Sequence, residues 1–554
     1  MSKRLVFDLL PILALAALAR LIFFSETVGS DEIVYLTRAQ HILHGEYPQA
    51  VYIGAMRDGI NIFLAASIFL FGTGIGGASG LFFACSLGQV LLAFGFADIL
   101  WGRRAAIWAA LGMAVLPIEI TLAGDLGPDP YLGFVISCSI VAFYFAERNG
   151  RAALYLAAGL LAGWVFWIKQ PAIVYGLVFP LLVRADHRWG VKRLWFVVGG
   201  MTLLMAHLAL FWIFYGDPAY FFESYHDYVK ETYISGDSTD TSLWPYVVLL
   251  FAKIYHTGLL GWLALAGCIQ GLMQRNRPEI RFVVIWGLGL LLIFSALPIS
   301  LSPLKFIAKQ SNYMAIFTLP LALIAGWFLA QQGRTIAFLL GGAMIASGIC
   351  LAALEQQVIS VVTVNGRSAA VFAQAHAGTP VFGPLTAQRQ SKLQRVLRGS
   401  LDASSDIRPL SDLAQLPLAG GAADDIVAYI IEDPQMSNWP EARREPAIPG
   451  LENCRAWVGQ LEASDLGYGR LVLAGLRDIV LSLLPADSAD RVLSATDPIW
   501  TVNRGEIYAV TRGCALARAM RSDEAISGRT SPWRLPNRNS RSGTAPSGAR
   551  GRDP

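Results

Sequence analysis

Apolar residues occur along the first two thirds of the chain in long runs, separated by short polar, basic or Gly/Pro breaks. A membrane-spanning helix needs about 20 predominantly apolar residues, and on that basis the runs predict eleven spans. They lie near residues 5–24, 79–100, 105–123, 130–146, 152–168, 172–183, 194–215, 246–272, 282–297, 313–330 and 335–353. The pattern therefore predicts a polytopic α-helical membrane protein.

One further apolar run, at residues 60–71, is only about a dozen residues long and ends in a Gly-rich break. A run of that length is more often interfacial or re-entrant than spanning, so we do not count it. Charge supports this choice, because a cytoplasmic N-terminus puts fourteen Lys and Arg residues in the inner loops and six in the short outer loops. Counting residues 60–71 as a span would invert every later loop.

The pattern changes near residue 355, where the composition becomes that of a soluble domain. Strand-like runs at 380–383, 426–431 and 506–511 alternate with helical stretches. We expect a transmembrane domain over 1–354 with its first outer loop at 25–78, a small periplasmic α/β domain over 355–521, and a disordered tail over 522–554. The apolar segment from Leu471 to Leu484 carries Arg477 and Asp478, which favours a core helix of the soluble domain over another span.

Composition agrees with a membrane protein, since 54% of residues are hydrophobic, 15% are charged and the mean hydropathy is +0.48. The net charge of +4 is small and its basic residues are scattered, so nucleic acid is not indicated as a partner. The first apolar run resembles a signal peptide, but no small-residue cleavage site follows it. We therefore expect a retained span and a location in a bacterial inner membrane.

Cysteine and histidine residues give little sign of a metal. Four of the six cysteines lie in apolar runs, where a thiol behaves as a small hydrophobe, and no cysteine or histidine spacing is typical of a metal site. We expect no cofactor, although a divalent metal stays open. Cys454 and Cys514 lie in the polar C-terminal third and could form a disulfide if that part is extracytoplasmic.

The unusual charged residues fall on the outer face in this topology. They are Asp31, Glu32, Arg57 and Asp58 in the first outer loop, Asp125 and Asp129 in the second, Lys169 in the third, and Lys305 and Lys309 in the fifth. The acidic pair Asp31 and Glu32 could merely cap a helix, and single lysines could be snorkelling anchors. Anchors explain the set less well, because lone outer cations run against the charge bias.

Carboxylates beside several cations at a membrane surface favour transfer of a group that leaves with a phosphate. A carboxylate can accept the proton of an attacking hydroxyl, while fixed cations stabilise the charge of the departing phosphate. A prenyl-phosphate sugar supplies such a phosphate and keeps its lipid tail in the bilayer. Because that phosphate is a weak base, no strong general acid is required.

Four segments resemble motifs of the GT-C glycosyltransferases, in the family that contains protein O-mannosyltransferases and the lipid A aminoarabinose transferase. SDEIVYLTRAQHILHGEYP is similar to the first-loop motif, the segment at Asp129 to the second acidic motif, WIKQP at Lys169 to the lysine-proline segment, and KQSNY to the Lys-x-x-x-Tyr stretch. Together they cover roughly residues 1–350. The matching positions include Asp31, Glu32, Tyr35, Asp129, Lys169, Lys309 and Tyr313.

The resemblance implies a GT-C fold and a glycosyltransferase that moves a sugar from a polyprenyl-phosphate donor to a hydroxyl of a glycolipid, polysaccharide or protein. We expect a monomer in which Asp31 is the base, Glu32 assists it and Asp129 orients a substrate. The residues expected to bind the donor phosphate are Arg57, Lys169, Lys309 and Tyr313. Further site candidates are Tyr35, Asp58, Asp125 and Lys305.

The chain departs from the family motifs at two places. Arg57-Asp58-Gly59 stands where relatives commonly have Lys-Pro-Pro, and Val34 replaces a basic residue. An arginine fork suits phosphate, but we expect Asp58 to offset part of that charge.

A transporter or flippase of lipid-linked sugars is the main rival function, although such proteins usually show internal repeats and none is visible here. An inactive relative that acts as an assembly scaffold is the other.

The charge bias predicts the outcome of a reporter experiment. A periplasm-dependent reporter fused after Glu355 should be active, and a cytoplasm-dependent reporter at the same position should be silent, because an odd number of spans puts this residue outside. Fusion after Arg103 is the matched control and should give the opposite result. Cytoplasmic activity after Glu355 would contradict the predicted orientation.

Overall fold

The structure is a computed structural model that describes most of the chain. The described residues are 3–25, 27–50, 52–183, 190–231, 241–274, 277–402, 404–416, 422, 424–433, 455–462, 467–500 and 502–513. Cys454, Cys514 and the predicted tail from residue 522 lie outside these ranges. The disulfide and the disordered tail therefore stay predictions.

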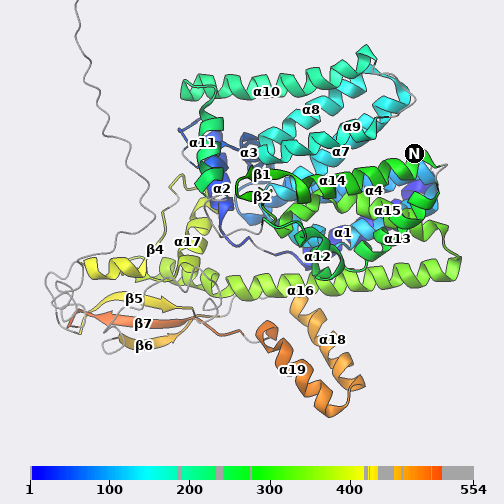
Figure 1. Cartoon of the computed structure of the whole chain (residues 1–554). Helices are drawn as coiled ribbons and strands as arrows, with labels where there is room; N and C mark the ends of the chain where they lie inside the picture. The colour runs from blue at the N-terminus through cyan, green and yellow to red at the C-terminus, as the bar shows by residue number, and fades with distance from the viewer. Residues whose placement is uncertain are drawn as a thin grey trace, which may run out of the picture.

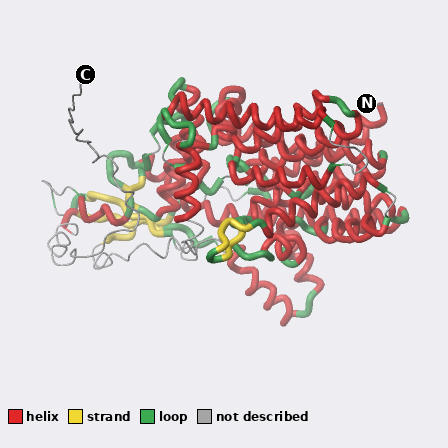
Figure 2. Tube along the Cα trace, turned by 45° about the horizontal axis from the view of Figure 1, so that its top comes forward, coloured by secondary structure: helices red, strands yellow, loops and turns green. Residues whose placement is uncertain are grey.

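Most of the described residues are helical (Figure 2). The bundle helices are α1 (Lys3–Ile22), α2 (Asp31–Leu43), α3 (Asp58–Phe71), α4 (Ile75–Trp101), α5 (Arg103–Ala114), α6 (Pro117–Thr121), α7 (Asp129–Asn149), α8 (Ala152–Ile168), α9 (Phe179–Leu182), α10 (Leu194–Tyr215), α11 (Tyr220–Val229), α12 (Pro245–Phe251), α13 (Leu260–Met273), α14 (Pro278–Ala296), α15 (Thr318–Gln331) and α16 (Arg334–Ala375). The 3₁₀ segments among them are η1 (Ile53–Met56), η2 (Leu122–Gly124), η3 (Gln170–Val178), η4 (Val191–Arg193), η6 (Ile254–His256) and η7 (Ser311–Ile316). A short hairpin of β1 (Pro298–Leu301) and β2 (Leu304–Phe306) precedes η7.

Within the described residues, five helices are long and apolar enough to cross a membrane, or six if the bent pair of α5 and α6 counts as one span. The five are Ile75–Trp101, Asp129–Asn149, Val191–Tyr215, Pro278–Ala296 and Arg334–Ala375. Shorter apolar helices lie among them, including α3, α8, α13 and α15. The chain is therefore a multi-pass membrane protein, and the count of eleven spans stays a prediction.

The bundle has two ends, which we call the far end and the domain end (Figure 1). At the far end, Arg103 at the start of α5 pairs with Asp8 in α1, with Nη2 and Oδ1 2.5 Å apart. At the domain end, the Gly74 N–H donates to the carbonyl of Leu397 in the C-terminal domain at 2.9 Å. Helix α4 therefore runs from the domain end to the far end.

Helix α3, which contains the excluded run 60–71, stays at the domain end. Its first residue, Asp58, accepts a hydrogen bond from Tyr47, which lies between α2 and η1. Its last residue, Phe71, is followed by the turn that brings Gly74 to Leu397, and Gly72 and Gly74 take φ values of 89° and 95° that favour glycine. Both ends of α3 thus lie on one side, as a non-spanning segment requires.

A buried polar network fixes the bend between α5 and α6. Pro117 has no N–H, so the carbonyl of Met113 loses its helical donor, and the chain turns by 59° at this break. The fully buried Arg20 of α1 donates to the carbonyls of Met113 at 3.4 Å and Ala114 at 3.0 Å. In an apolar interior such backbone groups need a partner. The bend carries the chain toward the acidic loop before α7.

The C-terminal part is an α/β domain joined to the bundle by α16, which is 42 residues long and passes residue 355 without a break (Figure 1). Its five-stranded sheet has the order β4-β3-β5-β7-β6. The elements are β3 (Val381–Phe382), α17 (Leu385–Leu397), β4 (Ile407–Arg408), η8 (Leu410–Gln415), β5 (Ile426–Glu432), β6 (Arg455–Gln460) and β7 (Glu506–Thr511). Strands β3, β5 and β7 occupy the three strand-like runs of the sequence.

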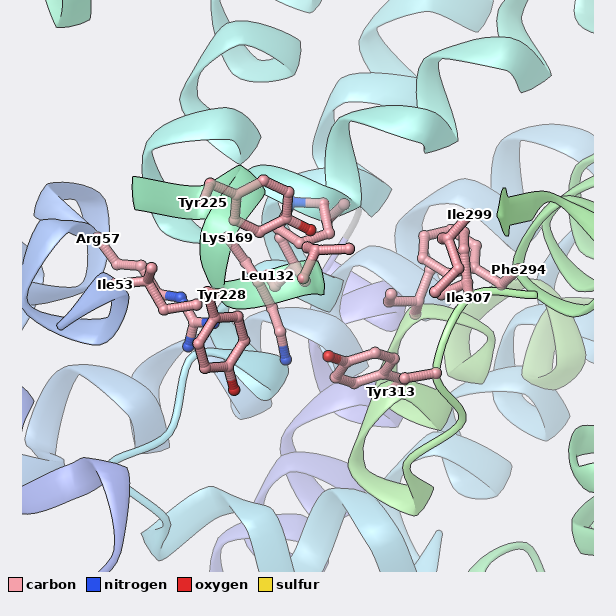
Figure 3. Close-up of a pocket in the computed structure, with 15 residues that line it drawn as sticks. Ile53, Arg57, Leu132, Lys169, Tyr225, Tyr228, Phe294, Ile299, Ile307 and Tyr313 are labelled. Carbon is pink, nitrogen blue, oxygen red and sulfur yellow. The ribbon is translucent and has the colours of Figure 1, made fainter. Parts of the chain in front are cut away.

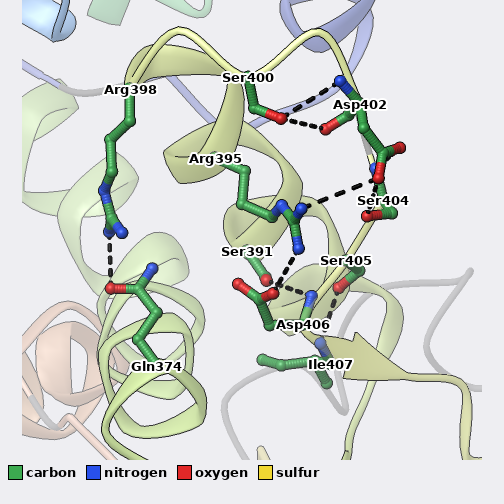
Figure 4. A network of polar contacts seen from close by, with 10 residues as sticks. All are labelled: Gln374, Ser391, Arg395, Arg398, Ser400, Asp402, Ser404, Ser405, Asp406 and Ile407. Atoms are coloured by element: carbon green, nitrogen blue, oxygen red, sulfur yellow. Dashed lines mark hydrogen bonds and ion pairs between the residues drawn. The ribbon is translucent and has the colours of Figure 1, made fainter. Parts of the chain in front are cut away.

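The loop between α17 and β4 is held by a polar network (Figure 4). Arg395 on α17 pairs with Asp406 at 2.7 Å and lies 3.8 Å from Asp402. The Ser391 hydroxyl accepts a hydrogen bond from the Asp406 N–H at 2.9 Å. These contacts fix the first strands of the sheet to α17, which packs against α2 of the bundle.

The prediction that Leu471–Leu484 forms a core helix is wrong. This segment belongs to α18 (Gly469–Leu483), which with α19 (Ala486–Trp500) projects from the side of α16 (Figure 1). Gly469 is the only residue of α18 that is buried among the described residues. The apolar positions predicted a buried face, but no described part of the sheet lies over it.

Candidate active site

A cavity at the domain end of the bundle brings together several of the predicted site residues (Figure 3). It has about 620 Å³ of empty space, including its open mouth. Its wall is mostly apolar, and its polar side chains come from η1, α8, α11 and η7. The lining residues are Ile53, Arg57, Leu132, Lys169, Pro171, Ala172, Tyr225, Tyr228, Val229, Phe294, Ile299, Ile307, Ala308, Tyr313 and Ile316.

Arg57 supplies one cation of this cavity. It stands between η1 and α3, where the chain turns, and only 7% of it is exposed. Its Nη1 donates to the Tyr35 hydroxyl and lies 3.9 Å from Oδ2 of Asp31. Its Nε makes no hydrogen bond within the described residues. Arg57 therefore keeps donor capacity for a ligand in the cavity.

Lys169 supplies the second cation. It stands at the break between α8 and η3, where its extended backbone (φ −157°) interrupts the helix. Its ammonium donates to Oδ1 of Asp129 at 2.8 Å and lies 3.7 Å from the centroid of the Tyr313 ring. Asn312 donates to the other oxygen of Asp129 at 2.6 Å. Both oxygens of this buried carboxylate are thus occupied, and Asp129 holds Lys169 toward the cavity.

Asp31 is a solvent-accessible carboxylate beside Arg57, although it does not itself line the cavity. It lies in the first turn of α2, and 46% of its side chain is exposed. Its Oδ1 accepts a hydrogen bond from the Tyr52 hydroxyl at 2.8 Å, and its Oδ2 lies 3.5 Å from the Tyr35 hydroxyl. The N-cap of α2 is Ser30, which makes no side-chain cap bond. The side-chain contacts of Asp31 among the described residues are therefore with Tyr35, Tyr52 and Arg57.

Glu32 and Asp125 are two further carboxyl groups near the site, and their charges interact. Glu32 accepts a hydrogen bond from the Ser30 N–H at 2.5 Å, so it contributes to the start of α2. Burial raises the pKa of Glu32. Burial, and then the charges of Glu32 and Asp129, raise the pKa of Asp125 to about 8. Neither carboxyl lines the cavity.

Asp58 does not line the cavity, and its effect on the charge of Arg57 stays a prediction. Its side chain is fully buried and turns toward Tyr47, whose hydroxyl donates to Oδ1 at 2.7 Å. Arg38 stacks over the ring of that tyrosine, 3.8 Å from its centroid. Adjacent positions at the start of α3 project in different directions, which separates Arg57 from Asp58.

Lys305 and Lys309 do not line the cavity. Lys305 lies in β2, and the ammonium of Lys309 lies 5.4 Å from the centroid of the Phe306 ring. Their neighbours Ile307 and Ala308 supply part of the apolar wall instead. The roles predicted for the two lysines stay untested.

Several aromatic and amide residues of the site were missed in the sequence. Tyr52 contacts Asp31, and Asn312 contacts Asp129. Tyr225 and Tyr228 project from α11 into the cavity (Figure 3). Their spacing of three residues places them on one helical face, which is the signal that could have identified them.

Fold and site together define a polytopic membrane protein with paired cations and a nearby carboxylate at one end of its bundle. Residues 59–213 match the family model described as dolichyl-phosphate-mannose-protein mannosyltransferase. No curated protein sequence is similar enough to count as a match.

Solved structures of ArnT from Cupriavidus metallidurans share the fold at 15% identity. The structure bound to undecaprenyl phosphate gives a TM-score of 0.56, with 84% of this chain and 97% of that chain covered. The apo structure gives 0.57, with 92% and 98% covered. These findings confirm the resemblance predicted from the sequence: part of the chain matches that family model, and the chain shares the fold of ArnT.

A metal site is not evident in the part of the chain that the structure describes. No group of three or more His, Cys, Asp or Glu side chains there could hold a metal ion. Asp31 and Asp129, which contact Arg57 and Lys169 of the cavity, are bonded to tyrosine hydroxyls, a lysine and an amide. Metal dependence therefore stays a matter for measurement.

Burial of Asp58 predicts a pH dependence of stability. Burial raises the pKa of this carboxyl from 3.8 to about 6, so stability should fall as pH rises from about 4 to about 6 and stay lower above that, by about 3 kcal/mol. Asp58→Asn removes the titration and keeps an oxygen acceptor for Tyr47. The variant should therefore melt at a higher temperature than wild type at pH 8, and at a similar temperature at pH 4.

The matched control is Asp478→Asn, because the side chain of Asp478 is 68% exposed. This control should keep the pH profile of the wild-type protein. A wild-type profile in Asp58→Asn as well would show that Asp58 is ionised in the folded protein without cost.

Proposed function

We propose that the chain is a membrane glycosyltransferase that moves a sugar from a polyprenyl-phosphate donor to a hydroxyl acceptor at this cavity. The observation that carries the proposal is the meeting of Arg57 and Lys169 at one apolar-walled cavity. These residues lie more than one hundred positions apart in the sequence. Burying two cations is costly unless anions are nearby; Asp129 bonds to Lys169, and Asp31, which is half exposed, lies 3.9 Å from Arg57.

The donor phosphate fits the cationic side of the cavity. An arginine fork and a lysine point charge suit phosphate oxygens, and both are largely removed from water here. The other side of the cavity presents Phe294, Ile299 and Ile307, which suits the first units of a polyprenyl chain. The likeness to ArnT, whose solved structure is bound to undecaprenyl phosphate, supports this choice of ligand.

Asp31 is the carboxylate best placed to accept a proton. Asp129 is buried and has both oxygens bonded, so protonating it would break the contact with Lys169. Glu32 is bonded to the backbone of Ser30. Asp31 is half exposed and lies beside Arg57, so an acceptor hydroxyl can reach it from solvent.

The reaction follows from these roles. The acceptor hydroxyl oxygen forms a bond to the anomeric carbon of the donor, and its proton passes to Asp31. The bond from that carbon to the phosphate oxygen breaks, and the electron pair leaves with the polyprenyl phosphate. Arg57 and Lys169 stabilise the charge that develops on this leaving group. We place the reaction on the periplasmic face, where the charge bias puts the domain end.

Asp31→Asn tests the base. The amide keeps the shape and loses the basic oxygen, so transfer should slow by about 10²-fold or more while the protein still folds. The product is identified by mass spectrometry of lipid A, glycan and glycoprotein fractions from cells with and without the gene. Its formation is then followed in membranes of each variant.

Asp402→Asn is the control, since the side chain of Asp402 is 68% exposed and lies in the C-terminal domain. It should transfer at the wild-type rate. Near-normal transfer by a folded Asp31→Asn protein would remove Asp31 from the mechanism. Identical fractions with and without the gene would contradict transfer itself and favour the transporter alternative.

Arg57→Gln tests the donor site. The loss of a charged hydrogen bond to phosphate should weaken binding of undecaprenyl phosphate by about tenfold or more, whereas Asp31→Asn should leave this affinity nearly unchanged. Titration of the purified protein with undecaprenyl phosphate gives both values. Arg398→Gln is the control, because Arg398 is bonded to Gln374 (Figure 4) and does not line the cavity. Equal affinities for Arg57→Gln and the control would exclude Arg57 as a phosphate ligand.

A further inference from the structure

Helices α18 and α19, which we call the side hairpin, belong neither to the bundle nor to the sheet. They are inserted between β6 and β7, which are antiparallel neighbours. Such strands can be joined by a turn of a few residues, so the sheet does not require the insertion. Both overall views show the side hairpin projecting from the flank of α16 (Figures 1 and 2).

Val472 and Leu473 at the start of α18 pack against the bundle, but the apolar side chains near the end of α18 are largely exposed. Ile479, Val480 and Leu483 are 59%, 43% and 79% exposed, and their spacing puts them on one side of the helix. Arg477 and Asp478 occupy other faces. Soluble surfaces rarely leave such a stripe in water, and this kind of amphipathic helix is typical of a membrane interface.

The side hairpin is attached where the transmembrane bundle ends. The N–H of Gly469, at the start of α18, donates to Oε1 of Gln356 in α16 at 2.5 Å. The amide nitrogen of the same glutamine donates to the carbonyls of Ile22 at 3.1 Å and Phe24 at 2.7 Å. These carbonyls lie where α1 ends, so Gln356 joins α18 to the domain end of the first span.

The length of α16 places this attachment relative to a bilayer. From Arg334 at the far end to Gln356, the helix rises by about 33 Å at 1.5 Å per residue. The hydrocarbon core of a bilayer is about 30 Å thick. Helix α1, with 20 residues, spans about the same thickness. The side hairpin therefore leaves α16 at the border between the hydrocarbon core and the headgroups on the domain side.

We propose that the side hairpin is an interfacial anchor that lays the apolar face of α18 into the phospholipid bilayer. The face enters the boundary between headgroups and acyl chains, to a depth of about 5–10 Å. The guanidinium groups of Arg470 and Arg477 reach the phosphates while their stems stay against apolar surface. The anchor holds the C-terminal domain to the membrane at a second point, besides α16.

A second copy of the chain fits this face less well than a bilayer does. A stable protein interface buries about 1,200–2,000 Å² in total, which is more than three exposed side chains on one helix supply. A bilayer needs no complementary partner surface, and it is already present at the height where Gly469 meets Gln356.

Photolabelling of the full chain in phospholipid nanodiscs tests the anchor. The probe is a phosphatidylcholine with a diazirine near the headgroup end of its acyl chain, and labelled positions are mapped by peptide mass spectrometry. Label should appear at Ile479, Val480 and Leu483, and at Trp212 and Ile213 of α10, which are 66% and 71% exposed on the bundle.

The internal control is β6, where Trp457 and Val458 are 61% and 49% exposed but belong to the sheet. These two residues should stay unlabelled. The double variant Ile479→Asp and Leu483→Asp should lose the label on α18 and keep it on α10, which reports that the bundle is intact. Label on α18 no higher than on β6, or cross-links between copies through α18, would overturn the proposal.

Discussion

The contact between Lys169 and Asp129 is the constraint on which the site depends. It joins the break after α8 to the start of α7, and both side chains are buried. Removing either partner would leave an uncompensated buried charge, at a cost of about 3–5 kcal/mol. Because Asn312 and the Tyr313 ring close on the same pair, three separate segments become one wall of the cavity. The pair thus fixes the cationic side of the cavity before any ligand arrives.

A polar network inside the bundle holds the segment that leads to Asp129. Pro117 interrupts the helix between α5 and α6, and Arg20 donates hydrogen bonds to the carbonyls of Met113 and Ala114 at this break. Glu119, which follows the break, is bonded to Ser86 of α4 and Thr318 of α15. The bent segment leads directly to Asp129, so the position of the site carboxylate depends on satisfied polar groups in an apolar interior. Such networks are costly when incomplete and rigid when complete.

Much of the bundle could be predicted from the sequence, because apolar runs and the charge bias follow from the bilayer itself. Arg57, Lys169 and Tyr313 line one cavity, as predicted from the charged residues on the outer face and from the family resemblance. The direction of single side chains did not follow: Asp58 turns to Tyr47 and away from its neighbour Arg57. Backbone geometry at the turn between η1 and α3 decides this, and no residue pattern encodes it. Tyr225 and Tyr228 were missed because a tyrosine side chain carries no charge, and the sequence prediction of the site rested on charged residues.

The side hairpin shows why apolar periodicity alone is ambiguous. The same pattern in α18 is compatible with a protein core or with a lipid surface, since both bury one face. The position of the helix relative to the bilayer distinguishes the two cases. The contact of Gly469 with Gln356 sets that position, about 33 Å along α16 from Arg334. A contact between residues more than one hundred positions apart therefore turns an expected core helix into a membrane-facing one. The candidate active-site cavity lies at the same end of the bundle, so a domain anchored there stays close to that cavity.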